Sequence, residues 1–158
     1  MLLSYRLFGD LSRIEIPAPA PSQRSDGLWQ HTCCEAFIAF SGETAYREFN
    51  FSPSGQWAAY AFSGYRQADD GAFIAPPPAI DIRSSDGELE LQVLLDLHTL
   101  PSGRHIGELR LGLSVVVEEH CSAGATHSYW ALKHPAERPD FHHPDGFALC
   151  LAPQPASR

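Results

Sequence analysis

Residues 108–118 read ELRLGLSVVVE, and this stretch decides the fold class. Leucine or valine occupies every second position from Leu109 to Val117, whereas Arg110, Gly112 and Ser114 fall between them. Successive side chains of a strand point to opposite sides of a sheet, so a period of two is typical of a strand with one buried face. The stretch therefore predicts a half-buried strand.

Similar segments lie along the rest of the chain, separated by Gly-, Pro- and Ser-containing turns such as Ser52-Pro53-Ser54-Gly55 and Ser85-Asp86-Gly87. The further predicted strands are 2–8, 33–40, 46–52, 56–62, 80–83, 88–95, 127–132 and 147–151. The turn at Ser85-Asp86-Gly87 predicts a hairpin of its flanking strands. Nine short strands separated by turns predict an all-β fold, a two-sheet antiparallel β-sandwich with an immunoglobulin-like or jelly-roll outline.

Length and charge narrow the function classes. The 158 residues fit one domain, expected over residues 1–152, with a flexible C-terminal tail at 153–158. The formal net charge of −8 disfavours nucleic-acid binding. No stretch approaches the roughly 20 apolar residues of a membrane span, so no membrane partner is expected. The opening MLLSYRLFGD lacks signal-peptide features, which together with cysteines expected to be reduced predicts a soluble, cytoplasmic protein.

Three tracts are rich in aromatic and polar residues, namely 28–40, 46–66 and 128–147. The motifs within them are Trp29 followed by Cys33-Cys34-Glu35-Ala36-Phe37, the hairpin Asn50–Trp57, the pair Tyr65-Arg66, the tract Ser128–Pro135 and the segment Pro139–His142. In these motifs, over nearly its whole length, the chain resembles the DOMON-like domains of bacterial proteins, which are related to family-nine carbohydrate-binding modules. The resemblance implies a sandwich fold and a non-catalytic module that binds a carbohydrate or another small ligand.

The resemblance also implies site residues. In the sugar modules two aromatic side chains enclose a terminal sugar, and Trp29 and Trp130 match them here. Glu35 and Asn50 match polar neighbours. This chain departs from the modules at Glu48, where they carry a basic residue, so the hydroxyl contacts are expected to differ.

Physical chemistry supports this kind of site independently. Sugar rings have apolar C–H faces that pack on flat aromatic surfaces, while carboxylates and amides bind the hydroxyls. Tyr46, Glu48 and Asn50 share a strand face, which suits a groove floor, and Arg66 is a further candidate polar partner.

Roles without ligand binding stay open for the same residues. Each of Trp29, Trp57 and Trp130 can equally be a core residue, because β-sandwiches bury tryptophan. Glu35 and Glu48 can equally be exposed, or paired with Arg47 or Arg66.

No cofactor is expected, although haem or a divalent metal stays an alternative. The only methionine is Met1, which disfavours the Met/His haem ligation of DOMON cytochromes, while a two-His arrangement stays possible on residue type. His134, Asp140 and His142 are candidate metal ligands, but their spacing matches no zinc motif and an exposed-His loop explains them too. Asp140 can alternatively accept backbone N–H groups in a turn.

An enzyme is less favoured than a binding module, and no catalytic residue is predicted. Glu35 and Glu48 on adjacent strands would permit glycosidase chemistry, but nothing in the sequence indicates that one acid stays protonated. Serine-hydrolase signatures are absent.

A structural or protein-interaction domain is the remaining alternative. Related domains usually have one more strand before the segment at 3–8, so the chain can begin at an internal methionine. That would leave an exposed sheet edge suited to self-association.

Overall fold

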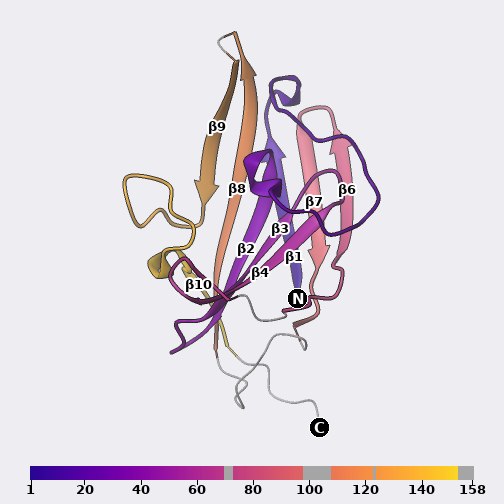
Figure 1. Ribbon diagram of the computed structural model, residues 1–158. Helices are drawn as coiled ribbons and strands as arrows, with labels where there is room; N and C mark the ends of the chain where they lie inside the picture. The colour runs from indigo at the N-terminus through magenta and orange to yellow at the C-terminus, as the bar shows by residue number, and fades with distance from the viewer. Residues whose placement is uncertain (70–72, 98–107, 123, 153–158) are drawn as a thin grey trace.

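The structure is a computed structural model, which describes residues 1–69, 73–97, 108–122 and 124–152. These residues form two antiparallel β-sheets and short 3-10 turns (Figure 1). The strands are β1 (Leu2–Phe8), β2 (Cys33–Phe40), β3 (Tyr46–Phe51), β4 (Trp57–Gly64), β5 (Gln67–Ala68), β6 (Ala79–Ser85), β7 (Glu88–Leu94), β8 (Leu109–Cys121), β9 (Gly124–Ala131) and β10 (Leu149–Leu151). The 3-10 turns are η1 (Leu11–Arg13), η2 (Leu28–Gln30) and η4 (Pro144–Gly146).

The smaller sheet has three strands in the order β1-β7-β6, and the larger has seven. The larger sheet runs β10-β8-β2-β3-β4-β5, and β9 also pairs with β8. Strands β10 and β9 share one edge of β8, with β10 opposite Leu109–Leu111 and β9 opposite Ser114–Cys121. The larger sheet therefore extends along β8 well past the end of β2, as Figure 1 shows for the long β8–β9 hairpin.

The main core lies between the two sheets. Alternation turns Cys34, Ala36 and Ile38 of β2 toward the smaller sheet, which contributes Leu91 and Val93. Of these, the larger buried side chains Ile38, Leu91 and Val93 each contribute about 1.5–3 kcal/mol. The sheets are also tied by hydrogen bonding, since the buried Tyr5 hydroxyl donates to the Glu35 carbonyl oxygen at 2.8 Å.

The opposite face of the larger sheet has a small apolar cluster of its own. Phe37, Ala39, Tyr46 and Phe147 are buried together there. Phe147 stacks on Phe37 with ring centroids 5.9 Å apart. It approaches β8 so closely that a Cβ at Gly112 would lie 2.9 Å from the Phe147 ring, which only glycine avoids. The cluster anchors the C-terminal segment on this face of the sheet.

All nine predicted strands are confirmed, with shifts of a few residues at their ends. The two predicted turns are also confirmed, because β3–β4 and β6–β7 are antiparallel neighbours. Strand β5 was not predicted, since two residues are too short to show a period. The predicted tail at 153–158 lies outside the described residues, and within them no helix is long and apolar enough to cross a membrane.

Candidate functional site

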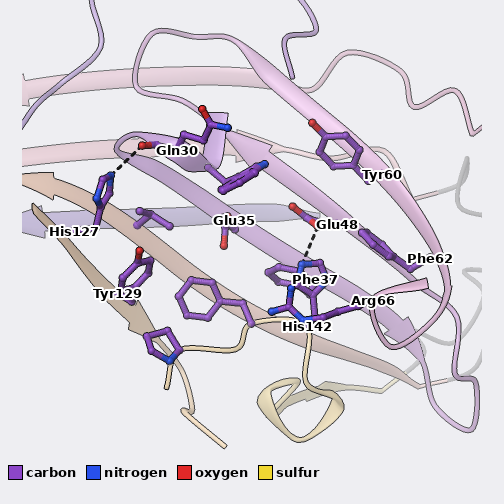
Figure 2. Close-up of a pocket in the computed structure, with 14 residues that line it drawn as sticks. Gln30, Glu35, Phe37, Glu48, Tyr60, Phe62, Arg66, His127, Tyr129 and His142 are labelled. Atoms are coloured by element: carbon purple, nitrogen blue, oxygen red, sulfur yellow. Dashed lines mark hydrogen bonds and ion pairs between the residues drawn. The ribbon is translucent and has the colours of Figure 1, made fainter. Parts of the chain in front are cut away.

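A pocket of about 630 Å³ lies on the face of the larger sheet that turns away from the main core. Strands β2, β3, β4, β8 and β9 contribute to it, together with η2, the turn before β5 and the segment after β9. The lining residues are Trp29, Gln30, Glu35, Phe37, Glu48, Tyr60, Phe62, Arg66, Val116, His127, Tyr129, Pro139, Phe141 and His142. Figure 2 shows Glu35 and Glu48 in the middle, between Tyr129 and His127 on one side and Tyr60 and Phe62 on the other.

Two carboxyl groups form the floor of the pocket. Glu35 of β2 pairs in register with Asn50 of β3, and Glu48 pairs with Phe37, so the two acids are diagonal neighbours on adjacent strands. Only 3% of Glu35 and 5% of Glu48 is exposed. Glu35 Oε2 accepts from the Ser114 hydroxyl at 2.9 Å, and Glu48 Oε1 accepts from the Asn50 amide at 2.9 Å.

Burial changes the acidity of both groups. Burial, together with the nearby Glu48, raises the pKa of Glu35 to about 8 against the lowering effect of the Ser114 hydrogen bond. Burial also raises the pKa of Glu48, with Asn50 and Arg66 acting in the opposite direction. A carboxyl group with a pKa near 8 is mostly protonated at neutral pH, so Glu35 can donate a hydrogen bond.

His142 lies beside this floor, with its Nε2 facing Glu48. The Tyr46 hydroxyl accepts the Arg66 backbone N–H at 3.2 Å and lies 2.8 Å from His142 Nδ1. The hydroxyl can donate its own proton to Nδ1, and in that tautomer the neutral ring carries its proton on Nε2, 3.6 Å from Glu48 Oε2. Burial, with the charge of Arg66, lowers the pKa of His142 to about 4, so the ring is neutral at pH 7.

Asp140 holds the C-terminal segment against the turn between β4 and β5. Its carboxylate accepts from the Tyr65 hydroxyl at 2.6 Å and from the Arg66 guanidinium at 2.9 Å. These hydrogen bonds and the Arg66 charge hold the pKa of Asp140 below its usual value despite partial burial. Arg66 takes a left-handed backbone conformation, with a φ of 54°. We call this group, Asp140 with Tyr65 and Arg66, the latch.

The upper walls come from η2 and β9. η2 supplies Trp29 and Gln30, and the Gln30 carbonyl oxygen accepts from His127 Nε2 of β9 at 3.0 Å. Tyr129, two residues further along β9, has its ring 6.2 Å from that of Phe141. Trp29 is 50% exposed and Tyr129 is 44% exposed, although both line the pocket. Such aromatic surface is available to a ligand.

Four of the six residues predicted to bind the ligand line this pocket: Trp29, Glu35, Glu48 and Arg66. Asn50 is fully buried and contacts Glu48 beneath the floor. Trp130 is 64% exposed but lies outside the pocket, because alternation along β9 puts it on the face opposite Tyr129.

The structure also decides the alternatives for these residues. Trp57 is a core residue, with 5% exposed, whereas Trp29 and Trp130 are not. The alternative of exposed acids is wrong, because Glu35 and Glu48 are covered by β9 and the C-terminal segment. Among the described residues neither acid forms an ion pair with arginine.

Sequence reasoning missed several pocket residues. Tyr60 and Phe62 could have been found, because the turn at 52–55 fixes the β3–β4 register and sets Tyr60 opposite Glu48. His127, Tyr129 and Phe141 left no such signal, since they reach the pocket through long-range packing.

The three candidate metal ligands have different partners in the structure. His142 contacts Tyr46 in the pocket, Asp140 belongs to the latch, and His134 is exposed with its ring 6.2 Å from Phe141. The sequence suggested backbone N–H groups as alternative donors to Asp140, but its carboxylate accepts from the side chains of Tyr65 and Arg66 instead. Within the described part of the chain, no three His, Cys, Asp or Glu side chains group as metal ligands would.

Comparison with known proteins gives one informative likeness. No protein-family model matches the chain, and no curated protein sequence gives a significant match. A crystal structure of a Bacteroides uniformis protein, for which carbohydrate binding is the suggested role, is similar with a TM-score of 0.60 and 16% sequence identity. The match covers 91% of this chain and 69% of that one. At this identity the likeness shows a shared fold.

Proposed function

We propose that this protein is a non-catalytic module that binds a carbohydrate in the pocket over β2 and β3. The observation that carries the proposal is the pairing of a polar floor, Glu35 and Glu48, with aromatic walls in a pocket of about 630 Å³. That volume suits one or two sugar rings, since ligand pockets commonly measure about 300–1,000 Å³.

The walls suit the apolar faces of a sugar ring. Trp29 from η2 and Tyr129 from β9 both line the pocket and keep about half of their surface exposed. We assign to them the stacking role predicted for Trp29 and Trp130. Phe141 beside Tyr129 widens the aromatic surface.

The floor suits sugar hydroxyls. Glu48 can accept hydrogen bonds, and Glu35, with its pKa near 8, can donate one. The Arg66 guanidinium is a further donor on the same side, and His142 Nε2 is another in the tautomer that accepts from the Tyr46 hydroxyl. Convergent donors and acceptors of this kind orient a hydroxyl-rich ring.

The fold likeness supports the proposal from another direction. The similar Bacteroides uniformis protein is suggested to bind carbohydrate, and the motif resemblance implies the same ligand class. We infer that the two packed sheets form a β-sandwich and that the chain is a DOMON-like domain.

A thermal-shift screen against mono- and oligosaccharides tests the proposal. A ligand at 100 times its Kd adds about 2.7 kcal/mol of stability, which is readily seen as a rise in Tm. We expect a sugar to raise the Tm of wild type and Trp130→Ala but not of Trp29→Ala. A shift that survives in Trp29→Ala and disappears in Trp130→Ala would place the site elsewhere, and no shift with any sugar would count against carbohydrate binding.

A further inference from the structure

The two acids of the pocket floor have no arginine or lysine partner among the described residues. Glu35 and Glu48 contribute two buried carboxyl groups to the floor. Asp26, which accepts from the Tyr60 hydroxyl at 2.9 Å, is already paired with Arg24 at 3.0 Å. Arg66 is the one arginine or lysine among the described lining residues. Its guanidinium already pairs with Asp140 at 2.9 Å.

The remaining groups around the floor do not supply a positive charge. His142 is neutral at pH 7, because burial and Arg66 lower its pKa to about 4. Tyr129 is a phenol, and His127 lies on the wall, where its Nε2 donates to the Gln30 carbonyl oxygen rather than to the floor acids. Two residues before Glu35 on β2, burial raises the pKa of the Cys33 thiol, which carries no charge.

The floor also keeps unused hydrogen-bonding capacity. Glu35 is 97% buried, and among the described residues only its Oε2 has a hydrogen-bond partner, the Ser114 hydroxyl. Glu35 lines the pocket, so its Oε1 is on the side that a ligand would occupy. Buried polar atoms usually have a hydrogen-bond partner, and a donor bound in the pocket would supply one for this oxygen.

We propose that the ligand carries an ammonium group, which makes the preferred ligand an amino sugar rather than a neutral sugar. This inference rests on the carbohydrate-binding function proposed above. An ammonium at the floor donates to Glu35 Oε1 and Glu48 and provides the missing positive charge. The aromatic walls add to the attraction, because a cation is stabilised over the faces of Trp29 and Tyr129.

Binding of an ammonium group has a proton signature that a neutral sugar lacks. Glu35 holds its proton at neutral pH in the free pocket. A positive charge beside it favours the carboxylate and lowers its pKa, so the bound state releases a proton. Calorimetry detects this release, because the measured heat then depends on the ionisation enthalpy of the buffer.

The test is isothermal titration of glucosamine, galactosamine and mannosamine, each beside its parent sugar and its N-acetyl form, with choline as an ammonium compound that is not a sugar. We expect at least one amino sugar to bind tenfold or more tightly than its neutral forms and to release a proton at pH 7. The ratio should fall to within twofold in Glu48→Gln. The matched control Glu43→Gln, an exposed acid outside the pocket, should keep the ratio.

Three results would overturn the inference, and they differ in what they say of the proposed function. Equal or tighter binding of a parent or N-acetyl sugar would support carbohydrate binding but show that the pocket does not prefer an ammonium group. Binding of choline without binding of any sugar would contradict both the amino-sugar preference and the carbohydrate-binding function. Binding of none of the compounds would contradict both as well. If Glu48→Gln does not melt cooperatively, Glu35→Gln takes its place in the same comparison.

Discussion

Glu35 combines three properties that set the chemistry of the pocket: it is buried, it faces a second acid, and its pKa is raised to about 8. Its folded pKa lies above the model-compound value of 4.5, so the folded protein holds a proton that the unfolded chain releases. The stability from this effect is complete below pH 4.5 and is lost as the pH rises through 8.

Replacement of Glu35 by Gln should therefore flatten the pH dependence of stability. At pH 9 we expect Glu35→Gln to be more stable than wild type by a few kcal/mol, since each pKa unit corresponds to about 1.4 kcal/mol. At pH 4, below the unfolded pKa, the two stabilities should converge. Urea unfolding at both pH values measures the difference. The exposed-acid variant Glu43→Gln should follow the wild-type profile. Parallel profiles for Glu35→Gln and wild type would contradict the assignment of a raised pKa.

The orientation of the floor residues could be predicted, but their burial could not. Alternation in residues 33–40 and 46–52 sets Glu35 and Glu48 on the faces opposite Cys34 and Phe49, as in the structure. A strand pattern does not indicate what covers the other face. Here β9 and the segment with Phe141 cover it, and their packing depends on contacts distant in the chain.

Strand β9 separates its two aromatic residues by alternation. Tyr129 faces the pocket and Trp130 the opposite side, where its indole N–H donates to Ser128 at 3.2 Å. Tyr129→Ala should weaken sugar binding at least tenfold, about 1.4 kcal/mol, whereas Trp130→Ala should stay within twofold of wild type. Titration calorimetry compares them. The reverse order of effects would show that the ligand lies on the Trp130 side.

The phase of β9 was beyond sequence reasoning for a simple reason. His127-Ser128-Tyr129-Trp130 shows no apolar–polar alternation, so the pattern predicts a strand without saying which aromatic faces inward. The pairing of β9 with β8 fixes the phase. By contrast, the regular alternation from Leu109 to Val117 predicted both the existence of strand β8 and which of its faces is buried.

The latch is a second element-scale feature that can be tested. Asp140→Asn removes the charge that holds Tyr65 and Arg66, and we expect a loss of about 1 kcal/mol or less, because Arg66 is largely exposed. Amide hydrogen exchange in residues 133–143 should become faster. Asp145→Asn, an exposed acid in the adjoining turn, is the matched control. Unchanged exchange in Asp140→Asn would mean that the Phe147 cluster alone holds the segment.

At the scale of the whole molecule, one face of the larger sheet forms the main core and the other face carries the pocket. One face packs on the smaller sheet and forms the main core with Leu91 and Val93. The other carries the pocket, with the Phe147 cluster beside it. The all-β fold could be predicted from period-two patterns alone, but a pocket whose walls range from Trp29 to His142 depends on the tertiary structure.

The three tryptophans offer the most direct test of the central claim, that a carbohydrate binds in this pocket. Trp29 lines it, Trp57 lies in the core and Trp130 lies on the opposite face. Fluorine NMR of protein labelled with 5-fluorotryptophan gives one resonance for each, assigned with single Trp→Phe variants. Addition of a sugar that raises the Tm should shift the Trp29 resonance saturably and leave the other two in place. A saturable shift of the Trp130 resonance with Trp29 unmoved would contradict the account.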